Sequence, residues 1–129
     1  MSNKSAMRTP LSRVRYLGAA HSGTEHFWKQ RVSAVALVIL TIAFIGIVFG
    51  LLGRNHAAAS QILGSPFVAI VMLMFVITSV YHMWLGMQVI IEDYVHSDFK
   101  LTLIMFNTFF CFAVGMSCVY AIVKLTFGV

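Results

Sequence analysis

The chain has 129 residues, of which 60% are hydrophobic and only 10% are charged, and its mean hydropathy is +0.89. Soluble domains have about 45–50% apolar and about 25% charged residues, so this composition excludes an ordinary soluble protein and indicates a membrane protein. The formal net charge is +5, but no folded recognition element accompanies the basic residues, so nucleic-acid binding is not expected.

Residues 1–25 form a polar and basic segment that contains Pro10 and has no sustained periodicity. We expect an irregular N-terminal arm at 1–25 on the cytoplasmic face of the membrane, followed by a transmembrane domain at 26–129. Because a signal peptide would place its apolar segment close to the N-terminus, the first apolar run is expected to be a retained span.

Three uncharged apolar runs follow, at 32–52, 62–91 and 101–123. Each exceeds the ~20 residues with which a helix rising about 1.5 Å per residue crosses a hydrocarbon core of ~30 Å. The sequence therefore predicts an all-α membrane protein with three transmembrane helices in an antiparallel bundle. These helices are expected at about 27–53, 62–93 and 98–125.

The first helix is expected to begin near His26, with an aromatic pair at the membrane interface, where aromatic side chains gather. Its apolar body contains Gly46 and Gly50, a spacing that lets two membrane helices approach closely. The polar connection at 53–61 is short, so the first two helices should be antiparallel neighbours.

The second helix is expected to run through Pro66, which is tolerated in the first turns of a helix. Either Ser97 or Asp98 could cap the start of the third helix. The third helix carries three residues that could form hydrogen bonds between membrane helices, namely Asn107, Thr108 and Ser117.

The two cysteines, Cys111 and Cys118, lie in the third run, where their spacing corresponds to about 10 Å of helical rise. This distance exceeds the reach of a disulfide, so both are expected to be free thiols. Without a cysteine cluster or a glycine-rich phosphate loop, the chain by itself is not expected to hold an iron–sulfur centre or a flavin.

Basic residues are concentrated on one side of the predicted bundle. They are Lys4, Arg8, Arg13, Arg15, Lys29, Arg31 and Lys100, whereas Arg54 and Lys124 lie on the opposite side. The positive-inside rule places the N-terminus in the cytoplasm and the C-terminus across the membrane, in the periplasm. Attraction to anionic lipid is an alternative role for the N-terminal charges, beside a specific protein contact.

The second predicted helix contains one histidine in its apolar body. His82 and Asp93 are eleven positions apart, which is only about 20° past three full turns, so both lie on one face, flanked by Ser79 and Gly86. If the helix ends near Asp93, His82 lies about 16 Å inward, close to the middle of a ~30 Å core.

Three roles are open for a histidine at this depth: a neutral side chain hydrogen-bonded to a neighbouring helix, a ligand of haem or another metal, or a member of a proton relay. Gly86 favours haem, because a macrocycle against a helix needs a missing side chain beside its axial ligand, although glycine could equally serve helix packing. The other histidines belong to the arm or the connections, so a second axial ligand would come from another polypeptide. They are His21, His26, His56 and His96.

Asp93 and Tyr94 fall at the cytoplasmic interface of the second helix. A tyrosine there is often a simple interface residue, and an acid at a helix end is usually solvated. A phenol beside a carboxylate could also serve a quinone, since the hydroxyl donates a hydrogen bond to a carbonyl and nearby groups supply protons on reduction.

At these residues the sequence resembles the small hydrophobic membrane-anchor subunit of succinate dehydrogenase, the succinate to ubiquinone oxidoreductase of respiratory membranes. The resemblance is carried by "HMWLGM" and by "EDYV", which follows after "QVII". The family's second helix has the form H-x-W-x-G-M, with D-Y eleven and twelve residues after the histidine. The matching residues are His82, Trp84, Gly86, Met87, Asp93 and Tyr94. "KQRVSAVAL" is similar to the start of the family's first helix.

The resemblance implies a non-catalytic anchor in a bacterial inner membrane, which pairs with a second three-helix cytochrome b subunit. The pair would hold a flavoprotein and an iron–sulfur protein at the cytoplasmic face, and electrons from succinate would pass through these to ubiquinone. His82 would be an axial ligand of haem b, and the partner subunit would supply the other histidine. Tyr94 would donate a hydrogen bond to ubiquinone, and Asp93 would belong to the quinone-site environment. Arg31 could pair with a haem propionate or the quinone environment, and His26 is a weaker candidate.

Two alternatives remain at this point. One is the anchor of a related fumarate reductase, which reverses the physiological direction. The other belongs to a different class: a small transporter or channel component in which His82 and Asp93 relay protons. The anchor hypothesis predicts copurification with three other chains, whereas the relay hypothesis predicts activity without them and no haem spectrum.

Overall fold

A computed structural model of the protein describes residues 9–11, 23–96 and 98–128. Its helices are α2 (Gly23–Leu51), α3 (His56–Gly64), α4 (Pro66–Tyr94) and α5 (Lys100–Phe127). Among the described residues there is no β-strand. Most of the expected arm at 1–25 lies outside these ranges, so that expectation stays a prediction.

Within the described part of the chain, three helices are long and apolar enough to cross a membrane: Thr24–Leu51, Pro66–Tyr94 and Lys100–Phe127. At about 1.5 Å of rise per residue, each is longer than the ~30 Å thickness of the hydrocarbon core. The prediction of an all-α protein with three transmembrane helices is confirmed.

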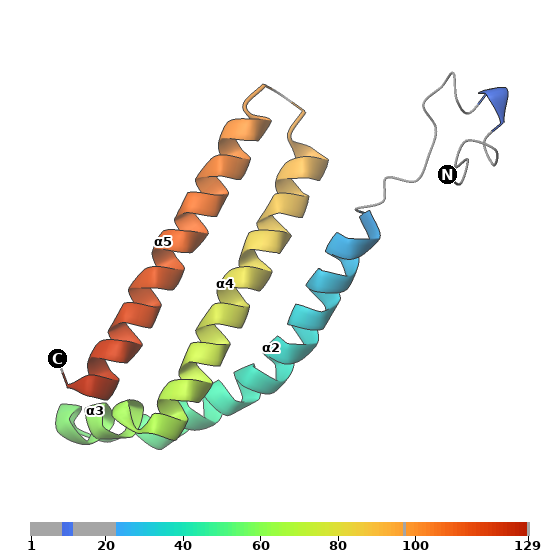
Figure 1. Ribbon diagram of the computed structural model, residues 1–129. Helices are drawn as coiled ribbons and strands as arrows, with labels where there is room; N and C mark the ends of the chain where they lie inside the picture. The colour runs from blue at the N-terminus through green and yellow to red at the C-terminus, as the bar shows by residue number, and fades with distance from the viewer. Residues whose placement is uncertain (1–8, 12–22, 97, 129) are drawn as a thin grey trace, which may run out of the picture.

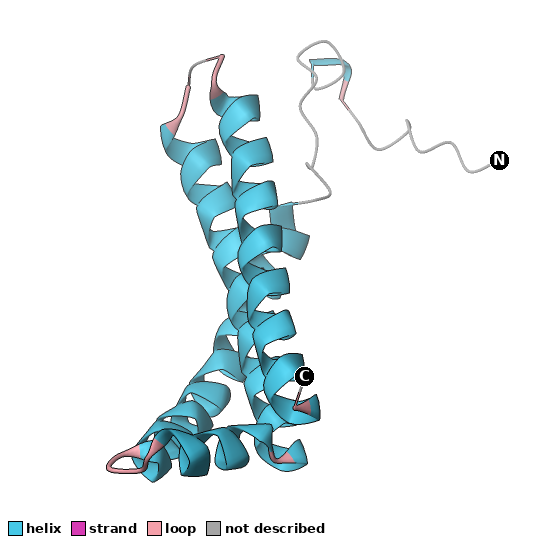
Figure 2. Ribbon diagram, turned by 90° about the vertical axis from the view of Figure 1, so that its left-hand side faces the viewer, coloured by secondary structure: helices cyan, strands magenta, loops and turns pink. Residues whose placement is uncertain are grey.

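The helix α4 lies between the other two long helices and packs against both (Figure 1). The helices α4 and α5 run side by side in opposite directions, joined by a short turn, and α2 crosses α4 obliquely (Figure 2). Gly115 of α5 faces Val80 of α4, and an added Cβ there would make an ordinary van der Waals contact at 3.4 Å. The central position of α4 means that its side chains decide how the bundle is assembled.

The predicted start of the second helix, at residue 62, is wrong, because the helix is interrupted at Ser65. Residues 56–64 form the separate helix α3, which lies across one end of the bundle (Figure 1). The side chain of Asn55 caps α3 by accepting a hydrogen bond from the Ala58 backbone N–H at 2.9 Å. Pro66 begins α4, and its ring disfavours helical backbone at the preceding Ser65, which is extended with ψ 137°. A proline that lacks an N–H is favourable at this first position.

The short helix α3 is held against the last turns of α5. A Cβ added to Gly64 would lie 2.7 Å from the backbone carbonyl oxygen of Leu125, closer than real Cβ contacts allow. Glycine at this position therefore lets the two backbones meet, and a larger residue would push α3 away from α5.

The other predicted boundaries differ from the structure by a few residues. The helix α2 begins at Gly23, before the expected His26, and α5 begins at Lys100. Phe99 occupies the N-cap position of α5 and gives no side-chain cap. Asp98 is therefore not the cap, and Ser97 lies outside the described residues.

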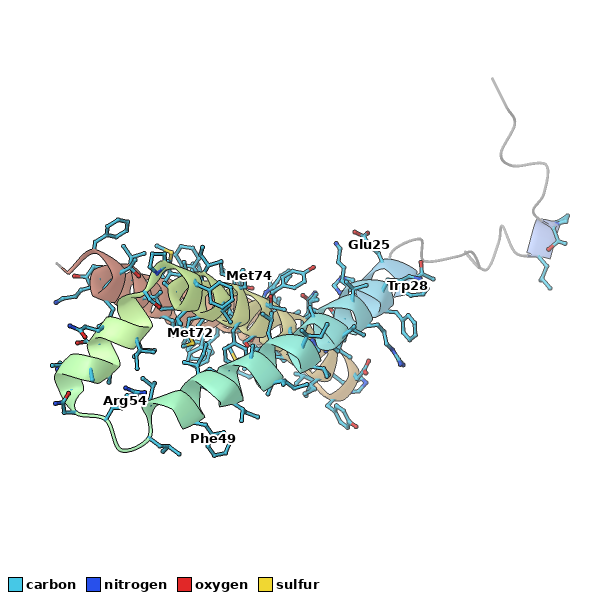
Figure 3. All side chains as sticks on the ribbon, turned by 90° about the horizontal axis from the view of Figure 1, so that it is seen from below. Glu25, Trp28, Phe49, Arg54, Met72 and Met74 are labelled. Atoms are coloured by element: carbon cyan, nitrogen blue, oxygen red, sulfur yellow. The ribbon has the colours of Figure 1, made fainter. Side chains whose placement is uncertain are left out.

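Few side chains are buried inside the bundle. The buried apolar residues among those described are Ala69, Leu85, Ile91 and Cys111. Large apolar side chains instead face outward, as Phe49 does in Figure 3. This side chain is 69% exposed. A hydrocarbon surrounding accepts such surfaces, so this distribution agrees with a membrane location.

Polar contacts join α4 to α5. The Asn107 side-chain amide, which is buried, donates to the backbone carbonyl of Trp84 at 3.2 Å, and Cys111 Sγ donates to Asn107 Oδ1 at 3.5 Å. The Trp84 indole N–H donates to Thr108 Oγ1 at 3.2 Å. Asn107 and Thr108 are thus confirmed as interhelical partners, whereas Ser117 donates to Ala113 of its own helix and has no interhelical partner among the described residues.

Two further expectations can be compared with the structure. Both cysteines are free thiols, as predicted. Gly46 and Gly50 lie on a face of α2 where no atom of the described chain comes within 4 Å of an added Cβ. The close helix approach expected from their spacing is therefore not made by the described helices of this chain.

We expect Asn107→Leu to lower the free energy of unfolding by about 1 kcal/mol, because an interhelical hydrogen bond in a membrane protein contributes about 0.6 and at most about 1.7 kcal/mol. The measurement is an SDS unfolding titration of the full chain in mixed micelles. Ser117→Ala is the matched control, since it removes a hydrogen bond within α5 only. Equal destabilisation by both substitutions would contradict the assigned role of Asn107.

Candidate functional site

His82 is half-buried on α4 and faces α2. Its Nδ1 lies 2.9 Å from Ser33 Oγ, and its Nε2 lies 3.4 Å from the Gln30 side-chain nitrogen. Gln30 and Ser33 are three residues apart on α2 and therefore share a face of that helix. The structure thus shows the first of the three roles open to His82, a hydrogen bond to a neighbouring helix.

The contacts of Ser33 favour one tautomer of His82. Ser33 Oγ donates its only proton to the backbone carbonyl of Gln30 at 3.0 Å. With that proton used, the Ser33 oxygen accepts from the histidine, an arrangement that corresponds to the Nδ1–H tautomer of His82. In this tautomer Nε2 has a free lone pair, which faces the Gln30 amide.

The Gln30 side chain is poorly satisfied where it lies. Its contact with His82 Nε2 at 3.4 Å is longer than the 2.7–3.2 Å typical of N–H hydrogen bonds. Its Oε1 is buried and has no hydrogen-bond partner in the structure. Gly86, one turn after His82, leaves room for this amide, since an added Cβ would lie 3.3 Å from Gln30 Nε2. The Gln30 amide therefore occupies the space in front of Nε2 without forming strong hydrogen bonds there.

The predicted Arg31 lies at the same seam between α2 and α4. A cavity of about 320 Å³ is lined by His26, Phe27, Gln30, Arg31 and Val89. The exposed Arg31 guanidinium stacks over the Phe27 ring, 4.6 Å from its centroid. Gln30 lines this cavity and also contacts His82, so the structure brings His82, Arg31 and His26 into one region.

Two histidines assigned to the arm or the connections belong to helices, although His26 lies where the first helix was expected to begin. His26 belongs to the first turn of α2 and His56 begins α3, rather than lying in the arm or a connection. In the described ranges, no group of three or more His, Cys, Asp or Glu side chains could hold a metal ion. A metal bound by His82 would therefore need other ligands than a group of His, Cys, Asp or Glu side chains from the described residues.

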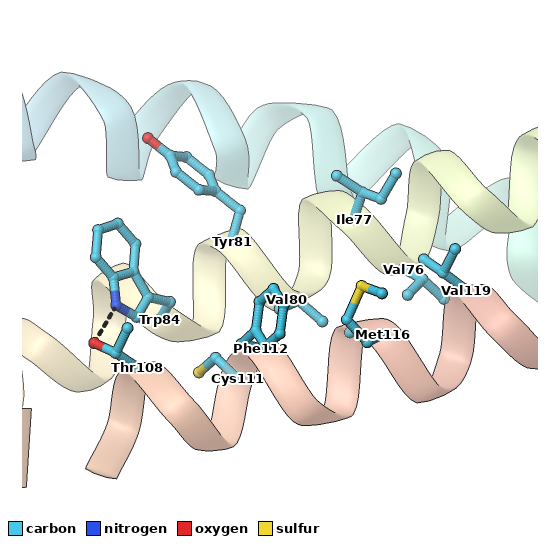
Figure 4. A pocket seen from close by; sticks show the side chains of 11 residues that line it. Val76, Ile77, Val80, Tyr81, Trp84, Thr108, Cys111, Phe112, Met116 and Val119 are labelled. Atoms are coloured by element: carbon cyan, nitrogen blue, oxygen red, sulfur yellow. Dashed lines mark hydrogen bonds between the residues drawn. The ribbon is translucent and has the colours of Figure 1, made fainter. Parts of the chain in front are cut away.

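Trp84 of the motif points to the other side of α4. It lines an apolar groove of about 360 Å³ between α4 and α5, where Figure 4 shows its bond to Thr108. Tyr81, Cys111 and Phe112 line the same groove. His82 and Trp84 therefore serve different helix interfaces although only one residue separates them.

Asp93 and Tyr94 lie in the last turn of α4, apart from His82. Asp93 is exposed and Tyr94 is 81% exposed, and no side-chain hydrogen bond holds either of them within the described residues. The nearby Lys100 donates to the backbone carbonyl of Glu92 at 3.0 Å and ties the start of α5 to this end of α4. The phenol and carboxylate are free to meet a ligand or another protein at the end of the bundle.

Sequence reasoning missed Ser33 and Gln30, the two residues that contact His82. Both stand in "KQRVSAVAL", and their spacing of three places them on one helical face. Two polar side chains on one face at the start of an apolar helix were the available signal. Their partner could not be found from the sequence, because it comes from a different helix.

The matching family model is that of the succinate dehydrogenase/fumarate reductase transmembrane subunit, over residues 5–123. A succinate dehydrogenase hydrophobic membrane anchor subunit of Paracoccus denitrificans is 35% identical over 120 residues, which cover 93% of each chain. The subunit of the same name from Rickettsia bellii is 38% identical, over 68% of this chain and 70% of its own. That of Rickettsia conorii is 30% identical, over 89% and 93%. No solved structure matches. The chain belongs to the family of succinate dehydrogenase/fumarate reductase transmembrane subunits.

Proposed function

We propose that this membrane anchor serves a succinate dehydrogenase, shares a haem b with a partner cytochrome b subunit and contributes to a ubiquinone site. The carrying observation is the surroundings of His82: its Nδ1 lies 2.9 Å from Ser33 Oγ, and its Nε2 faces the Gln30 amide, whose buried Oε1 has no partner in the structure. The names of the relatives favour succinate dehydrogenase over the fumarate reductase alternative.

The residues around His82 fit a haem. Gly86 leaves a space beside the histidine that the Gln30 amide occupies, and the buried Gln30 Oε1 has no partner to lose if this side chain moves aside. His82 Nε2 would hold the iron, and Arg31 would pair with a propionate, with His26 as a second candidate for that contact. When bound, haem b would accept and return single electrons near the middle of the membrane.

The second axial ligand would come from the partner subunit. Among the other described histidines, His26, His56 and His96 lie at helix ends or in a connection, far from mid-membrane depth. Long exposed apolar surfaces on α2 and α5 leave room for a second membrane subunit.

Tyr94 and Asp93 would form this chain's part of a quinone site. The Tyr94 hydroxyl is free to donate a hydrogen bond to a quinone carbonyl, and the adjacent carboxylate can order the site or pass protons as the quinone is reduced. Asp93 lies about three helical turns from His82, or about 16 Å along the helix. Electrons from succinate would arrive through the flavoprotein and iron–sulfur subunits.

The proposed orientation puts Tyr94 at the cytoplasmic face of a bacterial inner membrane. Lys29, Arg31 and Lys100 lie near the end of the bundle where α4 finishes, and Arg54 and Lys124 lie near the other end. The excess of Lys and Arg at the first end supports a cytoplasmic location for it and a periplasmic C-terminus.

We expect the purified complex to show a reduced-minus-oxidised b-type spectrum that His82→Ala abolishes or converts to a different coordination. The physical reason is the loss of one of two axial nitrogens. His96→Ala is the control, since His96 is exposed after α4. A wild-type complex with no b-type signal would contradict haem binding and would favour the proton-relay alternative.

Tyr94→Phe should reduce succinate-driven ubiquinone reduction about tenfold, which corresponds to the ~1.4 kcal/mol of one lost hydrogen bond. Reduction of an artificial acceptor by the soluble subunits should stay at the wild-type rate. Tyr120→Phe is the matched control, because Tyr120 is also exposed but lies on α5. If Tyr94→Phe lowers both activities equally, the effect is on assembly and the quinone role is wrong.

A further inference from the structure

The hydrogen bonds on the far side of the His82 ring form a chain that ends in the backbone. His82 Nδ1 lies 2.9 Å from Ser33 Oγ, and Ser33 Oγ–H donates to the Gln30 carbonyl at 3.0 Å, which leaves the Ser33 oxygen to accept from an Nδ1–H. Ser33 is only 5% exposed, so water does not compete for its hydroxyl. A hydroxyl that is itself a donor becomes a better acceptor, because hydrogen bonds in a chain polarise one another.

We propose that Ser33 is a positioning residue that fixes the Nδ1–H tautomer of His82 and strengthens its Nε2 as a ligand for the haem iron. This inference rests on the proposed function, since it assumes that His82 binds the iron. Ser33 would act through the imidazole ring, as the carboxylates and carbonyls behind metal-bound histidines do.

The direction of the effect follows from charge. A hydrogen bond from Nδ1–H to Ser33 moves electron density toward Nε2, which favours ferric over ferrous iron and lowers the midpoint potential. Removing the acceptor leaves the Nδ1–H buried without a partner and weakens this donation. The midpoint potential of haem b should then rise.

The Gln30 side chain has a different role from that of Ser33. It occupies the space in front of Nε2 and has to move before the iron can bind, but its backbone carbonyl stays in α2 as the end of the hydrogen-bond chain. The carbonyl is therefore available to Ser33 whether or not the side chain moves. Because the Gln30 backbone carbonyl stays in place, removing the Ser33 hydroxyl is the substitution that tests the hydrogen-bond chain.

The test is a potentiometric titration of haem b in the purified complex. For Ser33→Ala we expect a tenfold change in the ferric-to-ferrous affinity ratio, the lower limit for loss of such a partner, which raises the midpoint potential by about 59 mV for one electron. Ser33→Thr, which keeps the hydroxyl, should retain a potential near that of the wild type. Ser117→Ala is the control, because it removes a serine hydroxyl that bonds only within α5.

An unchanged potential in Ser33→Ala with full haem occupancy overturns the inference and leaves haem ligation by His82 intact. An equal rise in Ser33→Thr also overturns it, since the effect would then be one of packing. If instead His82→Ala keeps the wild-type spectrum and potential, the proposed function itself has failed, and this result does not depend on any Ser33 variant.

A second measurement covers the case in which Ser33→Ala does not assemble. In the haem-free full chain in lipid nanodiscs, ¹⁵N spectroscopy of labelled histidine, with His82 assigned by its loss in His82→Ala, reports which ring nitrogen carries the proton. We expect a protonated Nδ1 and an unprotonated Nε2. The opposite tautomer in the wild-type chain overturns the inference.

Discussion

In a hydrocarbon environment, apolar side chains gain little by contacting a neighbouring helix in place of lipid. The few polar side chains between the helices therefore decide how the helices associate. In this chain those contacts lie on both sides of α4. His82 bonds to Ser33 of α2, and Trp84 is bonded to Asn107 and Thr108 of α5. Each polar group buried here would be costly without a partner, so the contacts also fix the relative positions of the helices.

The sequence motif on α4 is divided between these interfaces because successive residues of a helix rotate by about 100°. His82 and Gly86 face α2, Trp84 faces α5, and Leu85, at 1% exposure, is buried in the bundle. Residues that are neighbours in the motif therefore contact different helices. The tryptophan holds α5 in place, while the histidine and glycine form the seam with α2 where Gln30 and Arg31 also lie.

Two features suggest a chain that is completed by other molecules. The Gln30 carbonyl oxygen Oε1 is buried without a partner, which is unfavourable in a dry interior. Tyr94, by contrast, ends α4 with 81% of its surface exposed beside an exposed carboxylate. In the proposed assembly, a haem would displace the first group and a quinone would meet the second, and both residues belong to the bundle that α4 holds together.

The sequence alone determined that the chain is helical and crosses a membrane three times, because long uncharged runs have no other favourable structure in lipid. It also identified His82, Asp93 and Tyr94 on one helix, since helical periodicity relates residues of the same element. It did not locate the break at Ser65, where the Asn55 cap and the Pro66 ring outweigh the apolar run. Only the tertiary structure placed Ser33 and Gln30 against His82 and Trp84 against Thr108. Those pairs lie on different helices, and their contacts depend on how the helices rotate and cross, which no local pattern specifies.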